Sequence, residues 1–368
     1  MKTKVYTKYL LGAIIVFLLH FQSKTFAQTF ASKVDSLLDA KYIPSEPGGV
    51  FLIAKNGKVV YKKSFGMANI ELDVPLKTEH IFEIGSMTKQ FTAVSILILL
   101  EEGKLELEDE ITKYIPDYPT QGKTITIHHL LNHTSGIKSY TSIKGLMGIA
   151  KKDLSPLELI DFFKNEPMDF SPGEKYKYNN SGYIILGYII ESISGMSYGD
   201  YVEEKIFNKL NMTSSFYASH RKVFKNRVSG YHNRDGFTNA MHISFTLPYS
   251  AGSLLSNVDD MLTWQNALRD YKLVSKNVLD KAFTNYTLSN NEATNYGYGW
   301  NIKEINDTKS LEHGGSIFGF KSMGVYLPAE DIYVIGLNNC DCNSPTKITR
   351  EIASLFLEEL DSMATNDN

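Results

Sequence analysis

The pattern of apolar and polar positions predicts strands near both ends of the chain and helices between them. Val50 to Ala54 and Val59 to Phe65 are apolar segments separated by Asn56-Gly57. Because both residues of an Asn-Gly pair adopt positive φ readily, this pattern predicts a β-hairpin with a two-residue turn. Gly324 to Leu327 and Ile332 to Leu337 flank a polar turn and predict a second hairpin.

Helical periodicity accounts for most of the remaining apolar positions. The predicted helices cover residues 30–40, 88–100, 183–193, 259–268 and 348–360. The two hairpins can join in one antiparallel sheet, with the terminal helices packed on it. We therefore expect an α/β (α+β) fold, in which an antiparallel sheet flanked by helices faces a mostly helical lobe across a cleft.

The first 27 residues have the pattern of a secretory signal peptide. Lys2, Lys4 and Lys8 precede an apolar run from Leu10 to Phe21, and Thr25-Phe26-Ala27 offers a cleavage site. The run is shorter than the roughly 20 residues of a membrane-spanning helix. We expect an exported protein, periplasmic or secreted, with no stable membrane span after cleavage; retention of the segment as an anchor is the alternative.

Residues 28–368 are then expected to form one folded unit. Its sheet lobe should cover about residues 28–75 and 295–365, and its helical lobe about residues 76–294. The formal net charge is only −3, with charges of both signs interspersed, which argues against a nucleic-acid partner. A bridge between Cys340 and Cys342 would be strained, so we expect two thiols without a catalytic role.

Ser86 and Lys89 are the first candidates for chemistry. The pattern Ser-x-x-Lys is weak alone, because it also occurs at Ser135, Ser219 and Ser344. Only Ser86 opens a long apolar helix, where it shares a face with the lysine and meets free backbone N–H groups. A serine hydroxyl needs a neighbouring base, and burial can lower the pKa of a lysine enough for that role.

Two further segments add polar groups to this candidate site. Tyr178-Asn179-Asn180 lies between a turn and a predicted helix, where active-site residues concentrate; a tyrosine hydroxyl can relay a proton, and the Asn180 amide can hold a substrate carbonyl. His313-Gly314-Gly315 lies ahead of the second hairpin, and its glycines would let a substrate backbone approach closely. The N–H groups of Ser316 and Ser86 could form an oxyanion hole.

These three motifs, in this order, resemble those of the serine β-lactamase and D-alanyl-D-alanine carboxypeptidase (penicillin-binding) superfamily. The Tyr-x-Asn version is similar to class C β-lactamases and their esterase and peptidase relatives. Other stretches that fit the resemblance are His133-Thr134-Ser135-Gly136-Ile137, Ala251-Gly252-Ser253-Leu254, Tyr298-Gly299-Trp300 and Gly319-Phe320. The resemblance covers about residues 30–360.

The resemblance implies an acyl-enzyme hydrolase without a cofactor. Ser86 would attack an amide or ester carbonyl, Lys89 and Tyr178 would transfer protons, and Asn180, His313, Gly315 and Ser316 would bind substrate. His313 stands where many members carry a lysine that attracts a substrate carboxylate. A histidine is only partly charged at neutral pH, so efficient binding of carboxylated β-lactams is in doubt.

Several alternatives remain open from the sequence. The substrate can be a peptide of the D-amino-acid or peptidoglycan type, a β-lactam, or an ester cleaved by a carboxylesterase, and a non-catalytic cell-wall ligand binder or sensor is possible on the same fold. His129 and His133 are four residues apart, but Leu130 stands where a zinc protease needs glutamate. We therefore expect no metal site.

Overall fold

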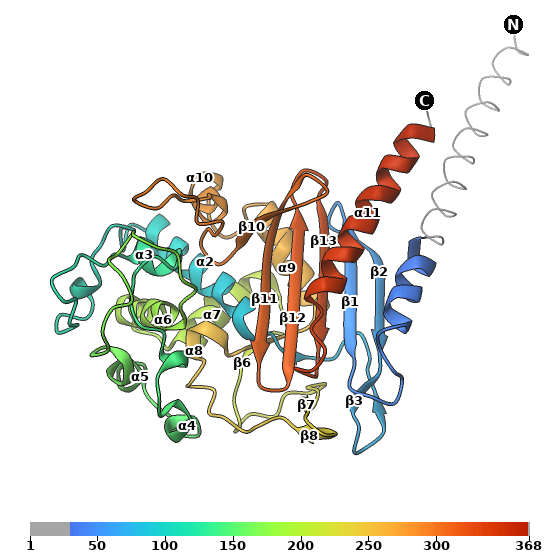
Figure 1. The fold of residues 1–368 in the computed structure, drawn as a ribbon, viewed down its shortest axis with the longest axis horizontal. Helices are drawn as coiled ribbons and strands as arrows, with labels where there is room; N and C mark the ends of the chain where they lie inside the picture. The colour runs from blue at the N-terminus through green and yellow to red at the C-terminus, as the bar shows by residue number, and fades with distance from the viewer. Residues whose placement is uncertain (1–29, 367–368) are drawn as a thin grey trace, which may run out of the picture.

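A computed structural model describes residues 30–366, and the predicted signal peptide, residues 1–27, lies outside them. In the described part, the main sheet is antiparallel, with the strand order β10-β11-β12-β13-β1-β2 (Figure 1). Its strands are β1 (Gly49–Lys55), β2 (Lys58–Phe65), β10 (Asn301–Ile305), β11 (Thr308–Ile317), β12 (Phe320–Leu327) and β13 (Ile332–Asn338). The two ends of the chain thus build one sheet.

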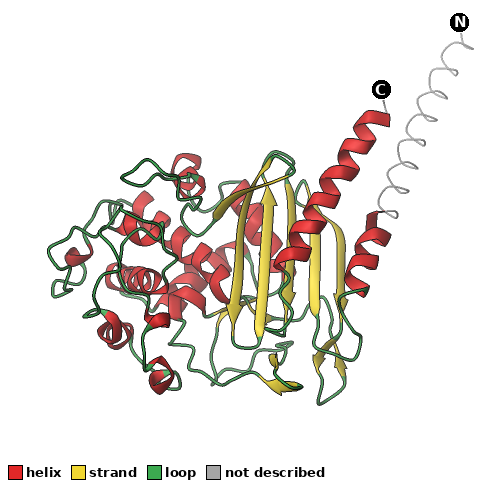
Figure 2. Cartoon of the chain, viewed as in Figure 1, coloured by secondary structure: helices red, strands yellow, loops and turns green. Residues whose placement is uncertain are grey.

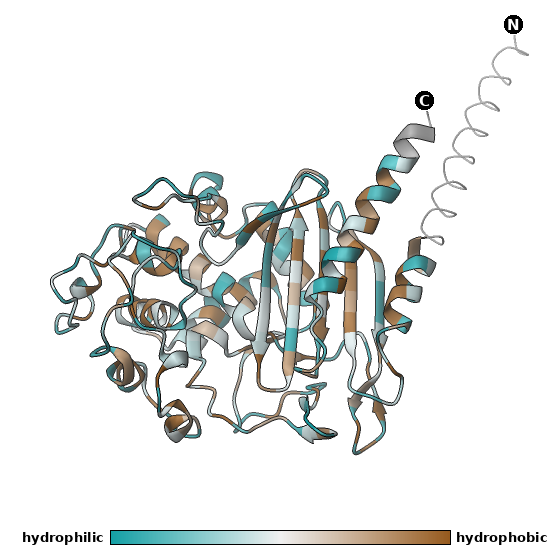
Figure 3. Cartoon of the chain, in the orientation of Figure 1, coloured by the Kyte–Doolittle hydropathy of each residue, from teal (hydrophilic) through white to brown (hydrophobic). Residues whose placement is uncertain are grey.

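The central strands are buried on both faces. The helix over residues 30–39 and α11 (Thr346–Asn366) pack on one face, together with Phe51 and Ile53 of β1. The helix α9 (Val258–Arg269) packs on the other, with Val50 and Leu52 (Figure 2). Burial on both faces explains why the sequence of β1 is a continuous apolar run rather than an alternating one. Figure 3 accordingly shows the middle of β1 as hydrophobic.

The helical lobe is built around α2 (Thr88–Glu101), whose side chains from Thr88 to Leu99 are all buried. α6 (Asn180–Ser194) and α8 (Tyr249–Gly252) pack against α2. The other α-helices of this lobe are α3 (Ile127–Leu131), α4 (Leu146–Ile149), α5 (Pro156–Phe163), α7 (Tyr198–Val202) and α10 (Lys276–Leu279). A helix that is apolar all round, as α2 is, belongs in the centre of a core.

Short strands connect the lobes. They form three small sheets: β3 (Met67–Asn69) with β4 (Val74–Pro75); β5 (Phe82–Glu83), β9 (Leu254–Ser256) and β6 (Phe216–Tyr217); and β7 (Tyr231–Asn233) with β8 (Phe237–Asn239). The pairing of β5 with β9 places the segment before α2 beside the segment after α8. This pairing positions the start of α2 at the boundary of the two lobes.

The predicted fold class is confirmed, but two strands of the main sheet were not predicted. β10 and β11 form a third hairpin, whose turn at Asn306 and Asp307 has positive φ at both residues. His313, Gly314 and Gly315 precede the second hairpin, β12–β13, as expected, but they lie inside the unpredicted strand β11 and pair with β12. Strand β11 buries Ser310, Glu312 and His313, so its sequence lacks the apolar alternation that signals a strand.

The expectation of two free thiols is also corrected. Cys340 and Cys342 form a disulfide directly after β13. The backbone of Cys340 also forms a β-bridge with Tyr231 of β7, so this segment joins the main sheet to the β7–β8 hairpin. Within residues 30–366, no helix is both long and apolar enough to span a bilayer.

Candidate active site

Ser86 lies in a 3₁₀ turn, η1 (Gly85–Met87), immediately before α2. Gly85 has φ +51°, a conformation that favours glycine, and the Ile84 N–H donates to the Leu254 carbonyl at 3.0 Å. The turn is thereby held on β9 while Ser86 remains half-buried. The local fold presents the Ser86 hydroxyl at the first turn of a helix, where backbone N–H groups lack helical partners.

Lys89 is fully buried and aims its ammonium group at Ser86. Its Nζ lies 3.3 Å from Ser86 Oγ and donates to Asn180 Oδ1 at 2.8 Å and to the Ala251 carbonyl at 2.9 Å. The Nζ also lies over the ring of Tyr178, 4.9 Å from its centroid. Burial lowers the pKa of Lys89 well below its usual value. A neutral lysine in this position can accept the proton of Ser86.

Ser86 is distinguished from the other Ser-x-x-Lys serines by this contact. Among the residues that the structure describes, only Ser86 has the side-chain nitrogen of the lysine three positions later within hydrogen-bond distance of its hydroxyl. Lys138 instead forms an ion pair with Asp169 at 2.9 Å, and Ser219 Oγ accepts a hydrogen bond from the Arg221 N–H. The choice made from helix context therefore agrees with the geometry.

Tyr178 brings its hydroxyl into the same space from the loop before α6. Tyr178 is partly exposed as a residue, but its hydroxyl is buried and has no partner in full hydrogen-bond geometry. Burial raises the pKa of Tyr178, while the nearby Ser86 hydroxyl opposes that rise in part. Tyr178 is thus a neutral phenol beside Ser86 and Lys89, in a position to give or accept one proton.

Asn179 and Asn180 begin α6 and have different tasks. Asn179 Oδ1 caps the helix by accepting from the Gly182 N–H at 2.9 Å. Asn180 Oδ1 accepts from Lys89, and its Nδ2 donates to Thr141 Oγ1 at 3.4 Å. The Asn180 amide, expected from the sequence to hold substrate, therefore also orients the lysine.

His313 is buried in β11 and uncharged at neutral pH. Its Nδ1–H donates to the Gly314 carbonyl at 2.7 Å, so its Nε2 accepts from the Tyr296 hydroxyl at 3.0 Å. Burial, with the charge of Lys89 as a smaller cause, lowers the pKa of His313 to about 3. An imidazole with this pKa offers a substrate carboxylate no positive charge, and both of its ring nitrogens already have partners within the chain.

Gly315 lets β11 pass close to the Ser86 turn. A Cβ at this position would lie 2.0 Å from the Ile84 carbonyl oxygen and 2.2 Å from Ser322 Oγ. The glycine therefore accommodates the chain's own backbone, whereas the sequence had suggested that it makes room for a substrate. Beyond Glu312, β11 pairs with β12 alone, which leaves its other edge facing the turn.

Ser316 lies at this open edge. A Cβ at Gly85 would come within 2.9 Å of the Ser316 backbone nitrogen, so the strand and the residue before Ser86 are in close contact. The side chain of Ser316 points to solvent, where its Oγ accepts from Lys321 Nζ at 2.7 Å. The backbone of Ser316 therefore lies in the site, whereas its hydroxyl lies outside it.

Sequence reasoning missed His133 and Tyr296. His133 is buried, its Nδ1 accepts from the Asn179 N–H at 3.2 Å, and its ring centroid lies 4.4 Å from that of Tyr178 and 4.6 Å from that of Tyr296. Burial, reinforced by Lys89 and His313, lowers the pKa of His133 well below its usual value. The stretch His133 to Ile137 was part of the resemblance, but nothing in its local pattern placed it beside Tyr178.

The histidines near His133 serve the fold. His128 Nδ1 hydrogen-bonds the Tyr298 hydroxyl at 2.7 Å, and His129 completes the capping box of α3 with Thr126. Residues 30–366 contain no group of three histidine, cysteine, aspartate or glutamate side chains arranged to hold a metal ion. These histidines therefore have structural partners of their own.

Comparison with known proteins identifies the family. The family model described as Beta-lactamase matches residues 30–354. The chain is similar to penicillin-binding protein 4* of Bacillus subtilis (strain 168), with 32% identity over 297 residues, 75% of this chain and 64% of that relative. The chain thus spans just under two thirds of the length of that curated relative.

Solved structures share the fold. The octameric penicillin-binding protein homologue of Pyrococcus abyssi superposes with a TM-score of 0.75 at 31% identity, over 90% of this chain and 77% of that one. The D-amino acid amidase of Ochrobactrum anthropi SV3 superposes with a TM-score of 0.76 over 93% of this chain and 99% of that one, and at 23% identity this likeness concerns the fold alone. The superfamily resemblance seen in the sequence is confirmed: the chain belongs to the Beta-lactamase family.

Proposed function

We propose that the chain is an exported serine hydrolase that cleaves amide or ester bonds through an acyl-enzyme on Ser86. The observation that carries this proposal is the position of Lys89, fully buried and 3.3 Å from Ser86 Oγ. A buried ammonium group without a carboxylate partner is costly, and a purely structural role would not require it to face a serine.

The reaction begins when neutral Lys89 takes the proton of Ser86. Ser86 Oγ bonds to the carbonyl carbon, and the carbonyl electrons move to oxygen, where the N–H groups of Ser86 and Ser316 stabilise the oxyanion. When the intermediate collapses, the carbon–leaving-group bond breaks and the leaving amine or alcohol takes a proton from Tyr178. Lys89 then returns its proton to Tyr178, whose hydroxyl lies over the same buried space.

The second half repeats these steps with water as the nucleophile. Neutral Lys89 accepts one proton from water as the water oxygen bonds to the acyl carbon. The bond to Ser86 Oγ then breaks, and Lys89 returns that proton to the serine through the Tyr178 hydroxyl, which gives one proton and receives another. Asn180 is placed to contribute its amide to the acyl group while it orients Lys89. The groups that hold a proton between these steps are all side chains of this protein.

The neutral state of His313 bears on the substrate. With a pKa near 3, this imidazole carries no positive charge for a substrate carboxylate, and both of its ring nitrogens are hydrogen-bonded within the chain. This neutrality argues against carboxylated β-lactams as preferred substrates, and the proposed substrates are peptides of the D-amino-acid or peptidoglycan type and simple esters. A carboxylesterase is the second candidate, and the same observation supports it.

Export is part of the proposal. It rests on the signal-peptide pattern of residues 1–27 and on the similarity to a penicillin-binding protein. An enzyme that acts on cell-wall peptides works outside the cytoplasm, so the two parts of the proposal agree.

The test uses three substrates: a fluorescent penicillin, a nitrophenyl acetate ester and a peptide ending in D-alanyl-D-alanine. Ser86→Ala should abolish every turnover and every covalent label of the wild type. Ser219→Ala is the matched control, because that serine also precedes a lysine by three residues but lies away from Lys89. Stable labelling with peptide turnover would indicate a penicillin-binding peptidase, and ester turnover alone an esterase. Equal behaviour of wild type and Ser86→Ala would reject catalysis and favour a binding protein.

A further inference from the structure

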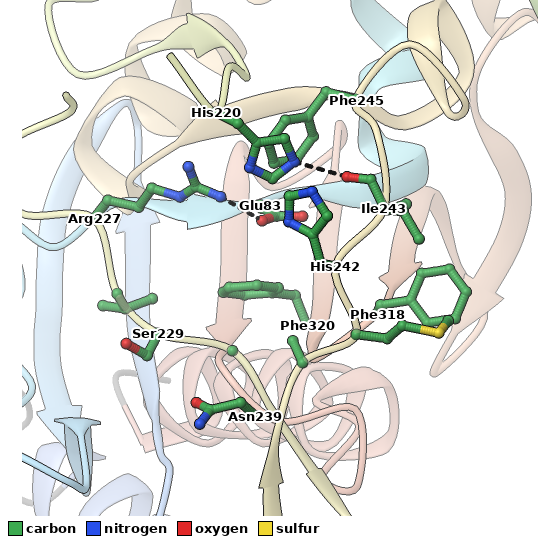
Figure 4. Close-up of a pocket in the computed structure, with 14 residues that line it drawn as sticks. Glu83, His220, Arg227, Ser229, Asn239, His242, Ile243, Phe245, Phe318 and Phe320 are labelled. Atoms are coloured by element: carbon green, nitrogen blue, oxygen red, sulfur yellow. Dashed lines mark hydrogen bonds and ion pairs between the residues drawn. The ribbon is translucent and has the colours of Figure 1, made fainter. Parts of the chain in front are cut away.

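A pocket lies beside β5, the strand that precedes the Ser86 turn (Figure 4). Its volume is about 400 Å³, and its lining includes Glu83, three residues before Ser86, and Phe318, two residues after Ser316. Neither Ser86 nor Lys89 nor Tyr178 lines it. The pocket is therefore distinct from the catalytic groups, although both sites share the β11–β12 hairpin.

An incompletely satisfied ion pair forms the polar part of this pocket. Arg227 Nη2 donates to Glu83 Oε1 at 2.9 Å, and this is the only hydrogen bond of either side chain within residues 30–366. Glu83 is more than nine-tenths buried. The second oxygen of Glu83 and the remaining N–H groups of Arg227 thus have no protein partner there. A buried charge is normally paired more fully, often by a two-bond arginine–carboxylate contact.

The pKa of the Glu83 carboxyl agrees with this incomplete pairing. Burial raises the pKa of the Glu83 carboxyl to about 7, although Arg227 opposes the rise. One positive group is therefore not enough to return the pKa of this carboxyl to its usual value. A second cationic group beside the free oxygen would compensate the charge.

Aromatic side chains surround the pair. The guanidinium of Arg227 lies over the ring of Phe245 at 5.2 Å. The ring of His220 also stacks on Phe245, and its Nε2 is hydrogen-bonded to the Ile243 carbonyl. Figure 4 shows Glu83 between Arg227 and His242, with Phe320 and Phe318 on the side toward the hairpin. Such walls fit an apolar or aromatic group next to a charged head.

We propose that this pocket binds a free amino acid in its zwitterionic form. The ligand carboxylate would accept from the unused N–H groups of Arg227, its ammonium group would donate to the free oxygen of Glu83, and its side chain would lie against Phe318. The volume suits one amino acid with a large apolar side chain. The inference is independent of the acyl-enzyme proposal, because it uses none of the catalytic groups.

Binding is tested by calorimetric titration of the full chain with D- and L-phenylalanine up to about 10 mM, a range that detects millimolar affinity. Phenylpropionate, which lacks the ammonium group, and phenethylamine, which lacks the carboxylate, should bind about tenfold more weakly or not at all. Binding of either enantiomer, with weaker binding of both analogues, supports the site. The enantiomer that binds shows whether the site accepts D- or L-amino acids. Failure of both enantiomers to bind overturns the proposal.

Variants locate the ligand. Arg227→Gln should weaken phenylalanine binding about tenfold or more while ester hydrolysis stays within about twofold of wild type. Phe318→Ala should weaken the binding of phenylalanine but leave the binding of glycine unchanged. This variant locates the ligand if Arg227→Gln does not fold. Asn180→Ala, in the catalytic cleft, should bind phenylalanine as wild type does. Binding that survives Arg227→Gln and disappears in Asn180→Ala would place the ligand in the cleft and refute the second site.

Discussion

The imidazole of His133 lies against the phenol ring of Tyr178, with the ring centroids 4.4 Å apart and the planes inclined by 50°. The Asn179 N–H donates to His133 Nδ1, so the neutral ring carries its proton on Nε2. Since Nε2 is buried and has no partner in the described chain, the ring is held by packing and by that single hydrogen bond. His133 is therefore a positioning residue for Tyr178.

Replacing His133 should reduce turnover more than substrate binding. We expect His133→Leu to lower kcat about tenfold or more with little change in KM, because the tyrosine loses its fixed orientation in the transition state. His133→Asn keeps an acceptor for the Asn179 N–H and should recover part of kcat. Steady-state kinetics on an ester check this, and equal losses in the two variants would contradict the positioning role.

Lys89→Arg should be inactive although the positive charge remains. Arginine stays protonated in proteins and cannot accept the Ser86 proton, so we expect kcat to fall by about 10³-fold or more. In the wild type, activity should rise with pH as Lys89 loses its proton, because only the neutral amine acts as a base. Burst kinetics of acylation report this step directly. An active Lys89→Arg enzyme would exclude Lys89 as the base.

Burial of Lys89 also affects stability. Its pKa is lowered in the folded state, so between that value and the usual 10.5 the unfolded chain binds more protons than the folded one. Stability from this group therefore increases with pH over that range. We expect the melting temperature of wild type to rise relative to Lys89→Met between about pH 7 and pH 9. The same difference at both pH values would argue against a lowered pKa.

His313 should not titrate in the working range. Its pKa of about 3 keeps the imidazole neutral from pH 5 to pH 8, so His313→Gln should leave the shape of the pH profile of kcat/KM unchanged. His313→Lys should lower KM for carboxylated substrates and leave KM for uncharged esters unchanged. If the wild-type preference for carboxylated substrates declined between pH 5 and pH 8 and His313→Gln removed this decline, a charged His313 would be indicated instead.

The glycines of β11 provide a matched pair. The Cβ of Gly315→Ala would collide with the Ile84 carbonyl, whereas that of Gly314→Ala would meet no atom closer than the Ser322 carbonyl oxygen at 3.3 Å. We expect Gly315→Ala to lower the free energy of unfolding by about 1–3 kcal/mol and to reduce activity by shifting β11 from Ser86. Gly314→Ala should change both far less. Thermal melting and ester kinetics measure the difference, and similar effects of the two substitutions would refute the close-approach argument.

The sequence by itself determined the elements whose signals are local. The Asn56-Gly57 turn, the apolar runs of β1 and β13 and the helix after Ser86 all follow from turn chemistry and periodicity over a few residues. The choice of Ser86 among four similar serines was possible because a long buried helix follows only that one.

Tertiary structure decided what depends on burial and on distant neighbours. β11 was missed because its buried positions include Ser310, Glu312 and His313. The two charged or titratable residues among them are acceptable inside because Glu312 binds Arg350 and His313 binds Tyr296. The charge of His313 could not be known, since a histidine titrates near neutrality in water and becomes neutral when buried beside Lys89. The contact of His133 with Tyr178 joins residues 45 positions apart, and no local pattern encodes such a distance.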